Sequence, residues 1–398
     1  MISQSGHNDP RVRRQAEALA EVGYEVDIIC AAMDKEEDKI EKFSAITFYK
    51  IIVKKRYEGF IKSSFQYFHF FTFAFVRLQY LSFRKGYDLI QVHNMPEFQV
   101  FTTCFQKIAG IPIVLDLHDL TPELFELKWG DKKKSSFIRI VRLVEKLSCR
   151  FADKLITVSE VCKEILVNRG VHPDKITLVL NTPDEKIFKY DTEREYRIIT
   201  IGAKLIYHGT VADRMGLHVV VEAMKYLNEK IPGSILDIYG YYDHSYKKYL
   251  ERLISEFNLE EIVFLKGEYS QEIIYGFIKE FDFGVVPYLD NIYMNLCLPT
   301  KMFEYNASLL PVVASRLKSP SLIFNDDSIG FTEPGNAHDM ADKIINLCSD
   351  PAKRKTMAAN AYSILQNISG QIMAERYVKL IDSTINQKKP LLQISERT

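Results

Sequence analysis

Residues 298–308, LPTKMFEYNAS, combine side chains that can bind a nucleoside diphosphate. Pro299 suits the start of a helix and Thr300 can cap it. The free backbone N–H groups at such a start attract phosphate oxygens, and Lys301 adds a positive charge. Glu304 lies one turn further along the same face, where its carboxylate can accept hydrogen bonds from ribose hydroxyls. The segment alone equally allows an ordinary surface helix.

Polar side chains follow two apolar, strand-like runs. His93 and Asn94 come directly after YDLIQV, and His118 and Asp119 follow IPIVLDL, with Glu123 shortly beyond. Ligands on parallel α/β sheets bind beyond the carboxyl ends of strands, so these residues are expected on one rim. A lone histidine there is more often structural, whereas two on neighbouring strand ends favour a functional site.

Two glycine-containing loops also precede predicted helices. In SGHNDPRVRR, Gly6 permits close backbone approach, Asp9 can cap the helix, and Arg11 is placed near the histidine rim. In YHGTVADRMG, Gly209 follows a strand and Arg214 stands at the next helix entrance, where it suits an anion. A surface arginine at a helix start is also common.

Alternating strands and helices must position these residues, which favours parallel sheets. Strand-like runs are Glu25 to Cys30, Tyr87 to Val92, Pro112 to Leu117, Lys154 to Val158, Thr177 to Leu180, Ile201 to Tyr207, Ser234 to Tyr239, Val263 to Lys266, Phe283 to Pro287 and Pro311 to Ala314. Helix-length segments include Arg11 to Val22, Ser136 to Phe151, Leu217 to Asn228 and Tyr246 to Phe257. The irregular stretch 181–197 is interpreted as a linker between two such units.

Composition sets the protein class. The 398 residues are 47% hydrophobic and 26% charged, which is typical of a globular chain with room for two domains. Its 52 basic residues balance 52 acidic ones, which argues against nucleic-acid binding driven by net charge. The six cysteines form no CxxC pair, and polar residues occupy 3–14, where a signal peptide needs an apolar core. These features predict a cytoplasmic protein with peripheral attachment to the inner face of the membrane as one option.

Residues 54–85 carry dense aromatics between two basic clusters. Gln66, His69, Arg77 and Gln79 interrupt the apolar part and make it too polar for a solitary spanning helix. Aromatics flanked by Lys and Arg suit a helix in the bilayer interface. A core helix packed on the sheet is an equally good interpretation, and the two are compatible if each face does one job.

Eight segments, in chain order, resemble the family-4 type glycosyltransferases of bacterial surface and exopolysaccharide synthesis. They are NDPRVRRQAEALAEVGYEV, YDLIQVHNMPEF, VLDLHDLTPELF, ADKLITVSE, LVLNTPDEKIF, YHGTVADRMGL, FDFGVVPY and LPTKMFEYNASLLPVVAS. Each is weak alone, but eight in order with compatible spacing argue against coincidence. The resemblance covers nearly the whole chain.

The resemblance implies an α/β, GT-B architecture of two Rossmann-like domains with parallel sheets facing a central cleft. Residues 1–185 would bind the acceptor and 195–371 the donor, with a last helix at about 372–388 crossing back to the first domain. The implied activity is transfer of a sugar from a nucleoside-diphosphate sugar to a lipid-linked glycan, with retention at the anomeric carbon and no metal or other cofactor. Residues 54–85 would lie nearest the lipid.

The resemblance also implies roles for individual residues. Glu304 would bind the donor ribose, Lys301 and the backbone of Pro299 and Thr300 the diphosphate, and Arg214 its charge. His118 would lie beside the donor sugar and orient it rather than remove a proton. The remaining donor-side residues would be Gly6, Gly209, Thr210 and Gly240, and the acceptor side would comprise Arg11, His93, Asn94, Asp119 and Glu123.

The chain departs from its relatives in one position near the sugar. Many relatives carry a second glutamate eight residues before the ribose glutamate, where this chain has Leu296. Relatives also begin with a full apolar strand before the glycine loop, whereas only residues 1–5 precede Gly6 here. These two departures motivate an alternative hypothesis, a catalytically weak nucleotide-sugar binder within a polysaccharide-assembly complex. A sugar-nucleotide epimerase is a third hypothesis, which the HNMPEF and HDLTPE segments disfavour.

Overall fold

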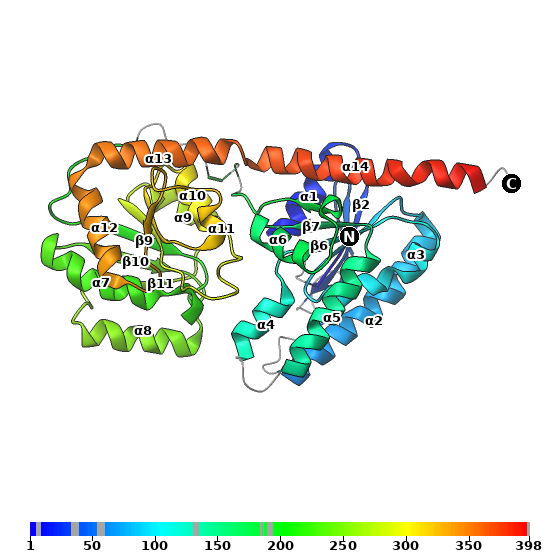
Figure 1. Cartoon of the computed structure of the whole chain (residues 1–398), viewed down its shortest axis with the longest axis horizontal. Helices are drawn as coiled ribbons and strands as arrows, with labels where there is room; N and C mark the ends of the chain where they lie inside the picture. The colour runs from blue at the N-terminus through cyan, green and yellow to red at the C-terminus, as the bar shows by residue number, and fades with distance from the viewer. Residues whose placement is uncertain are drawn as a thin grey trace. The chain divides into compact units, whose positions relative to one another are not determined.

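The computed structural model divides the chain into two compact units, each built on its own β-sheet (Figure 1). Unit 1 comprises Met1–Leu180 and Gln371–Thr398, and unit 2 comprises Asn181–Gly370. The described residues are 1–4, 9–32, 40–53, 60–129, 135–183, 185, 187–188 and 194–395. Gly6 and residues 54–59 therefore lie outside the described part.

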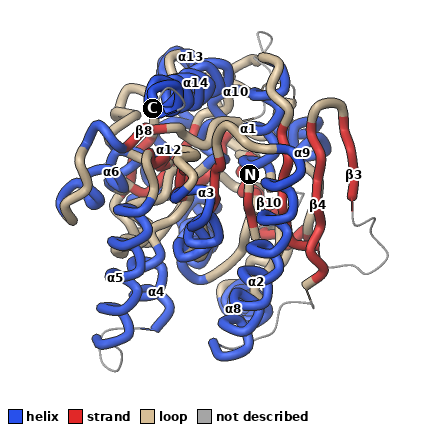
Figure 2. Tube along the Cα trace, turned by 90° about the vertical axis from the view of Figure 1, so that its right-hand side faces the viewer, coloured by secondary structure: helices blue, strands red, loops and turns tan. Residues whose placement is uncertain are grey.

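Unit 1 contains an eight-stranded sheet in the order β3-β4-β2-β1-β5-β6-β7-β8. All neighbouring pairs are parallel except β3 with β4, which form an antiparallel edge that Figure 2 shows in red. The strands are β1 (Ile2–Ser3), β2 (Val26–Ala32), β3 (Ile40–Phe43), β4 (Ile46–Ile52), β5 (Ile90–His93), β6 (Ile113–Leu117), β7 (Lys154–Thr157) and β8 (Ile176–Leu178). β1 pairs with β2 and β5 through only its two residues.

Helices cover this sheet on both faces (Figure 2). They are α1 (Pro10–Glu21), α2 (Phe60–Lys85), α3 (Cys104–Ile108), α4 (Thr121–Trp129), α5 (Ser135–Phe151), α6 (Glu160–Asn168) and α14 (Gly370–Ser395), with 3-10 turns η1 (Glu97–Thr103) and η2 (Pro173–Lys175). α1 begins as expected, because the Asp9 carboxylate accepts from the backbone N–H groups of Arg11 and Val12 and Pro10 fills the first helical position. α14 packs within unit 1, where Tyr24 bonds to Asp382.

Unit 2 contains a six-stranded, fully parallel sheet in the order β11-β10-β9-β12-β13-β14. Its strands are β9 (Lys204–His208), β10 (Ile235–Tyr239), β11 (Val263–Gly267), β12 (Phe283–Val286), β13 (Val312–Ser315) and β14 (Gly330–Thr332). The helices are α7 (Leu217–Lys230), α8 (His244–Glu256), α9 (Gln271–Ile278), α10 (Thr300–Ala307), α11 (Lys318–Ser321), α12 (Ala337–Ser349) and α13 (Pro351–Gln366), with the 3-10 turn η3 (Asp213–Met215). Leu205, Ile206 and Tyr207 of β9 are fully buried in its core.

The expected α/β class with two parallel-sheet domains is confirmed, and each of the ten expected strands has a counterpart. Four further strands, β1, β3, β4 and β14, are not among those ten runs. The capping prediction for α10 was wrong in one detail: Pro299 is the N-cap, and Thr300 is the first helical residue and gives no side-chain cap. Among the described residues, no helix has the length and apolarity needed to cross a bilayer.

α2 explains why two interpretations of residues 54–85 were compatible. Phe70 and Ala74 on one face are fully buried, and the helix packs on β2, β4 and η1. On the opposite face, Phe65, Phe68 and Phe83 are 71%, 65% and 94% exposed. Large apolar side chains on a helix face are normally covered by a packing partner. The exposed aromatic face of α2 is therefore unusual for a helix in contact with water.

Candidate functional site

Unit 2 has a cavity of about 420 Å³ at the carboxyl ends of β9, β10 and β11, where α10 begins. This is where open parallel sheets place their ligands. Its walls come from the loops after those strands, from α9 and α10, and from Tyr288. The lining residues are His208, Gly209, Thr210, Met215, Tyr239, Gly240, Tyr241, Glu268, Tyr269, Gln271, Ile274, Tyr288, Thr300, Lys301 and Glu304.

Two glycines keep the floor of this cavity open. Gly209 has φ +115° and Gly240 has φ +146°, values that other L-residues rarely adopt. A Cβ on Gly240 would lie 1.7 Å from the carbonyl oxygen of Gly209, and a Cβ on Gly209 would lie 3.2 Å from Cε of Lys301. The two loops therefore approach each other more closely than side chains would allow, and their backbone is presented to the cavity.

Lys301 supplies a positive charge at the helix start. Its side chain is almost buried, with 7% of the residue exposed, and its Nζ donates to Tyr288 Oη at 2.6 Å. The ammonium also lies 4.7 Å and 4.9 Å from the ring centres of Tyr207 and Tyr288. No carboxylate of the described residues forms an ion pair with it, so a bound anion would supply the countercharge.

Glu304 is 3% exposed and lies one turn along α10 from the helix start. One carboxylate oxygen contacts Nε2 of His208, and the other accepts from Gln271 Nε2 at 3.2 Å. His208 is in turn held by Tyr305, whose Oη lies 3.0 Å from Nδ1. Each carboxylate oxygen has two lone pairs, so Glu304 can accept further hydrogen bonds from a ligand while its orientation is fixed.

Not every donor-side residue expected from the sequence lines this cavity. Gly209, Thr210, Gly240, Thr300, Lys301 and Glu304 do, whereas Pro299 and Arg214 are not among the lining residues. Arg214 lies half-buried in η3, just before Gly216, and its Nε is buried without a hydrogen-bond partner among the described residues. Its placement agrees with the expected helix entrance.

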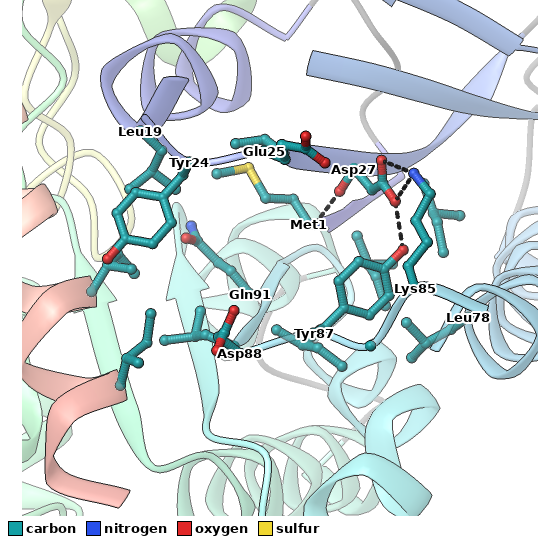
Figure 3. A pocket seen from close by; sticks show the side chains of 18 of the residues that line it. Met1, Leu19, Tyr24, Glu25, Asp27, Leu78, Lys85, Tyr87, Asp88 and Gln91 are labelled. Carbon is teal, nitrogen blue, oxygen red and sulfur yellow. Dashed lines mark hydrogen bonds and ion pairs between the residues drawn. The ribbon is translucent and has the colours of Figure 1, made fainter. Parts of the chain in front are cut away.

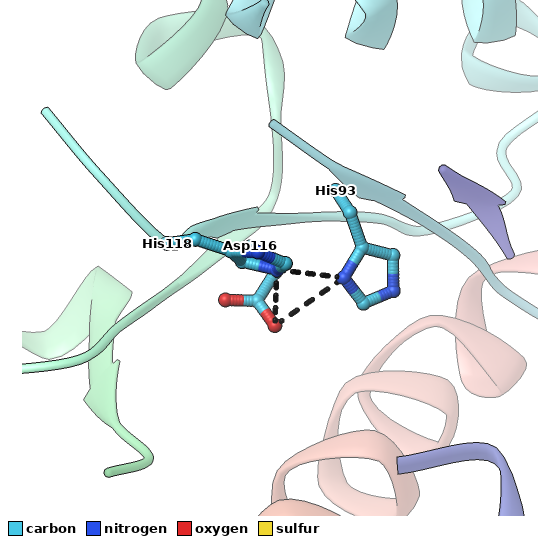
Figure 4. Close-up of side chains that lie close together, drawn as sticks. All are labelled: His93, Asp116 and His118. Atoms are coloured by element: carbon cyan, nitrogen blue, oxygen red, sulfur yellow. Dashed lines mark hydrogen bonds and ion pairs between the residues drawn. The ribbon is translucent and has the colours of Figure 1, made fainter. Parts of the chain in front are cut away.

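Unit 1 brings two of the predicted rim residues, His93 and His118, into contact. His93 ends β5 and His118 follows β6, and the two imidazoles meet edge to face with His93 Nδ1 3.0 Å from His118 Nε2 (Figure 4). Oδ2 of Asp116, which the sequence did not single out, lies 3.6 Å from the first and 3.7 Å from the second of these nitrogens. His93 and Asp116 are buried, whereas the His118 side chain is 15% exposed.

Arg11 is less exposed than the rim position predicted for it. Its guanidinium is buried and bonds to both carboxylate oxygens of Asp116, at 2.9 and 3.0 Å, and to the carbonyl of Val179 at 2.9 Å. Burial acts to raise the pKa of Asp116, but the charge of the Arg11 guanidinium beside it lowers the pKa, which lies well below its usual value. Arg11 therefore holds Asp116 ionised and in place.

Asn94 connects the two rim loops. Its side chain accepts from the backbone N–H of His118 at 2.7 Å and donates to the carbonyl of Asp119 at 2.6 Å. It also donates to Glu97, a buried carboxyl whose pKa is raised by burial and which accepts from Thr121. Asn94 is 2% exposed, so it shapes the His118 loop from inside.

Glu123 takes a different place from the one predicted. It is 2% exposed and forms an ion pair with Arg169, which also contacts both oxygens of Glu145 at 2.8 Å. Arg169 thus forms ion pairs with two buried carboxylates, those of Glu123 and Glu145. The Glu123 side chain is part of the domain interior rather than a group presented on the rim.

Unit 1 has a cavity of its own, which opens at the amino ends of its strands (Figure 3). It measures about 560 Å³, and three of the polar side chains that line it contact one another. The Asp27 carboxylate accepts from Lys85 at 2.8 and 2.9 Å and from Tyr87 Oη at 2.7 Å. Lys85 neutralises Asp27, and the cavity lies away from the strand ends where parallel sheets bind ligands, so the donor site is sought in the unit 2 cavity instead.

Sequence reasoning missed residues that act on the predicted ones. His208, Gln271 and Tyr288 contact Glu304 or Lys301, and Asp116 organises the histidine rim. His208 immediately precedes Gly209 at a strand end, which was a readable signal. Gln271 and Tyr288 carry no local signal, because tertiary structure alone brings them to the cavity.

Comparisons with known proteins agree with this geometry. Residues 11–185 match the family model described as Glycosyltransferase Family 4, and residues 191–364 match that of Glycosyl transferases group 1. Among curated proteins, the chain is 21% identical over 309 residues to a chitobiosyldiphosphodolichol beta-mannosyltransferase of Candida glabrata, covering 70% of this chain. It is 26% identical over 119 residues, 28% of this chain, to the protein of that name from Candida albicans. These matches span 66% and 25% of the relatives' own lengths.

Solved structures share the fold at low identity. The sucrose-phosphate synthase of Thermosynechococcus elongatus superposes with a TM-score of 0.75 at 18% identity, covering 97% of this chain and 95% of that one. Anabaena Alr3699/HepE in complex with UDP gives 0.70 at 17% identity, with 96% and 98% covered. The complex of the same protein with UDP-glucose gives 0.68 at 17%, with 96% and 99% covered. The chain thus belongs to the GT-B glycosyltransferases, with a family 4 domain followed by a group 1 domain.

Proposed function

We propose that this glycosyltransferase moves a sugar from a nucleoside-diphosphate sugar to a lipid-linked glycan acceptor in cell-surface polysaccharide synthesis, with retention at the anomeric carbon. The observation that carries the donor assignment is the unit 2 cavity. It gathers a buried ammonium, a helix N-terminus and a buried carboxylate one turn apart on α10. Anabaena HepE, which shares the fold, has been solved with UDP and with UDP-glucose.

In this proposal the diphosphate lies at the start of α10. The backbone N–H groups of Thr300 and Lys301 and the Lys301 ammonium bind its oxygens, and the loop backbones at Gly209, Thr210 and Gly240 close around it. Glu304 accepts hydrogen bonds from the ribose hydroxyls. By the family pattern, Arg214 adds charge and Pro299 sets the helix start, and the same pattern assigns Gly6, which lies outside the described residues, to donor binding.

The chemical step concentrates negative charge on the departing nucleoside diphosphate. Groups that bind this charge more strongly as it grows lower the barrier, which is the role we assign to Lys301, Arg214 and the α10 amides. A diphosphate oxygen accepts the proton of the attacking hydroxyl on the face that the leaving group vacates. His118 orients the sugar, and Asp119, His93 and Asn94 shape the acceptor side, with Arg11 and Glu123 supporting it from within.

We propose that this charge stabilisation needs no metal. His93, Asp116 and His118 place one ligand atom each within 4.8 Å of one another and could hold an ion. Both oxygens of Asp116 already accept from Arg11, and Oδ2 also accepts from Gln15 at 2.7 Å. A metal ion bound by Asp116 would therefore lie next to the positive charge of the Arg11 guanidinium. Transfer rates measured with EDTA and with added Mg²⁺ or Mn²⁺ test this point, and a loss of activity with EDTA that metal restores would overturn it.

The lipid part of the proposal rests on the outer helices of unit 1. α2 contains no Asp or Glu, and its outward face is aromatic. On α5, Ile140, Leu143 and Leu147 are exposed between exposed Arg and Lys, while the one acidic residue of that helix, Glu145, is buried. The exposed charged side chains of α2 and α5 are thus all basic, although Arg142 pairs with Glu126 of α4 and Lys85 pairs with Asp27. Exposed apolar side chains flanked by basic ones suit anionic lipid headgroups.

Vesicle sedimentation tests the lipid surface. Wild type should bind vesicles containing phosphatidylglycerol and bind phosphatidylcholine vesicles weakly, and Phe68→Ser with Phe83→Ser should reduce binding several-fold. Ile201→Ser, which removes a 69% exposed apolar residue from unit 2, is the matched control and should change nothing. Equal binding by wild type and the double variant would contradict the assignment.

Sugar transfer is tested by nucleotide release and by the product anomer. We expect one nucleoside-diphosphate sugar to release its diphosphate in the presence of a lipid-linked acceptor, and slowly to water without one. NMR of the product then reports retention or inversion at the anomeric carbon. Nucleotide binding with no release under either condition would favour the non-catalytic binder instead, for which the buried Leu296 near the expected sugar position is the motivation.

A further inference from the structure

A continuous chain of buried polar side chains runs from α14 to the histidine rim of unit 1. Tyr377 Oη donates to Gln91 Oε1 at 2.6 Å, and Gln91 Nε2 donates to Gln15 Oε1 at 2.6 Å. Gln91 Nε2 also lies 3.2 Å from His93 Nε2, and His93 Nδ1 lies 3.0 Å from His118 Nε2. Each contact has a direction, because a hydrogen bond needs one donor and one acceptor.

The direction of the whole chain follows from Asp116. This carboxylate is ionised beside Arg11, so its oxygens can only accept. Gln15 must therefore turn its NH₂ group toward Asp116, at 2.7 Å, which leaves Gln15 Oε1 as an acceptor on its other side. The Gln91 atom that meets this oxygen must be its NH₂ group, and Gln91 Oε1 then accepts from Tyr377.

The same reasoning fixes the proton of His93. The Gln91 NH₂ group has a second hydrogen, and the imidazole nitrogen beside it, Nε2 of His93, must accept. Burial holds the pKa of His93 well below its usual value, so this imidazole is neutral and carries one proton. That proton is on Nδ1, from which it is donated to Nε2 of His118.

We propose that this chain locks neutral His118 in the tautomer protonated at Nδ1, so that His118 presents a hydrogen-bond donor, and no basic nitrogen, to an oxygen of its ligand. Nε2 accepts from His93, and Nδ1 has no hydrogen-bond partner within the described part of the chain. Gln91 and His93 are then positioning residues, and the ligand group is an oxygen of the sugar or phosphate of the donor. This assignment of the ligand rests on the proposed function, whereas the tautomer does not.

The locked tautomer limits the chemistry that His118 can perform. A histidine whose exposed nitrogen already carries a proton cannot take one from an acceptor hydroxyl, so base catalysis by His118 is excluded in its neutral form. It can stabilise a donor oxygen by donation, which agrees with a step in which the leaving diphosphate accepts the proton. The unconstrained neutral imidazole prefers its proton on Nε2, so the lock has a measurable signature.

Ring ¹⁵N shifts of the full-length protein measure the tautomer directly, without any nucleotide. We expect neutral His93 and His118 both to carry the proton on Nδ1. The signals of each histidine are assigned by their disappearance in His93→Phe and in His118→Gln. In His93→Phe the aromatic contact is kept and the acceptor role of His118 Nε2 is removed. His118 should then move toward the Nε2-protonated form, donating to Asp116. His172→Phe changes a 74% exposed imidazole and is the control.

Two outcomes would overturn the inference: a neutral wild-type His118 protonated at Nε2, or a His118 tautomer unchanged in His93→Phe. A third would replace it, namely loss of the His93 Nδ1–H signal on adding Zn²⁺ at stoichiometric amounts while His118 keeps its Nδ1–H, which would make His93 Nδ1, Asp116 Oδ2 and His118 Nε2 a metal site. The wild-type measurement stands even where a variant does not fold.

Kinetics separate this inference from the proposed function. His93→Phe should lower kcat by about 10- to 100-fold with KM for the donor changed less than about threefold, because a donated hydrogen bond to a developing charge is lost. If no nucleotide sugar is turned over while both histidines are protonated at Nδ1, the proposed function fails and the lock stands. If sugar is transferred while neutral His118 is protonated at Nε2, the lock fails and the function stands.

Discussion

Replacing Lys301 with methionine isolates the contribution of its charge to donor binding. Methionine keeps an unbranched stem of similar length, so packing against Tyr207 and Tyr288 is largely preserved. In the free protein the ammonium is buried with Tyr288 Oη as its hydrogen-bond acceptor and has no ion pair among the described residues. Removing it should therefore change the free energy of unfolding little.

The effect on a bound diphosphate should be large. A hydrogen bond to a charged group contributes about 1.5–3 kcal/mol, and the Coulomb energy of two charges near a protein surface adds to it. A loss of about 2–4 kcal/mol corresponds to a roughly 30- to 700-fold weaker Kd. The matching nucleoside, which has no phosphate, should lose less than about threefold. The difference between the two ligands is the prediction.

Isothermal titration calorimetry of wild type and Lys301→Met with the nucleoside diphosphate and its nucleoside measures both values. Lys230→Met, at an exposed position in the same unit, is the control for a lost charge far from the cavity. Equal losses for the diphosphate and the nucleoside would show that Lys301 acts through structure. No loss for the diphosphate would refute the placement of the phosphates at the start of α10.

Three further predictions concern the loops and the interior. Gly240→Ala should cost about 2 kcal/mol or more in unfolding free energy and abolish nucleotide binding, since its Cβ meets the Gly209 carbonyl at 1.7 Å; normal binding by a folded variant would be inconsistent with the geometry. Asp9→Ala should lose about 1 kcal/mol in urea unfolding, because two α1 N–H groups lose their acceptor; an unchanged midpoint would argue against the cap. Burial raises the pKa of Glu145 from 4.5 to about 7, so the folded state binds this proton more tightly than the unfolded state. The free energy of unfolding should therefore fall as the pH rises from about 4.5 to 7. Glu145→Gln should flatten this decline in urea titrations, and the same pH dependence in wild type and variant would contradict it.

Local sequence signals were sufficient for much of the fold. Apolar runs marked the central strands, and the expected Asp9 cap marked the start of α1 as the structure has it. The β3 strand was missed because all four of its residues, IEKF, are exposed at a sheet edge and show no buried face. β14 has three residues, which is too short for a period-two pattern to be visible.

The candidate sites were predictable where chemistry and spacing coincide in one segment. Lys301 and Glu304 share a helix and line the same cavity, as their spacing indicated. Their partners were not predictable, because His208 lies 96 residues from Glu304 and Arg11 lies 105 residues from Asp116. Such pairs form only when the tertiary structure brings segments together that are far apart in the sequence. Glu123 was misplaced for the same reason, since its partner Arg169 is 46 residues away.

The most direct test of the central claim is a thermal-shift panel of UDP, GDP, dTDP and ADP on wild type and Glu304→Ala. A ligand that binds the folded state raises its melting temperature by mass action. The proposed function predicts that one nucleotide stabilises wild type selectively and that Glu304→Ala loses most of this shift while remaining folded. No shift with any of the four in a folded sample, or an equal shift in both proteins, would contradict a nucleoside-diphosphate site on α10.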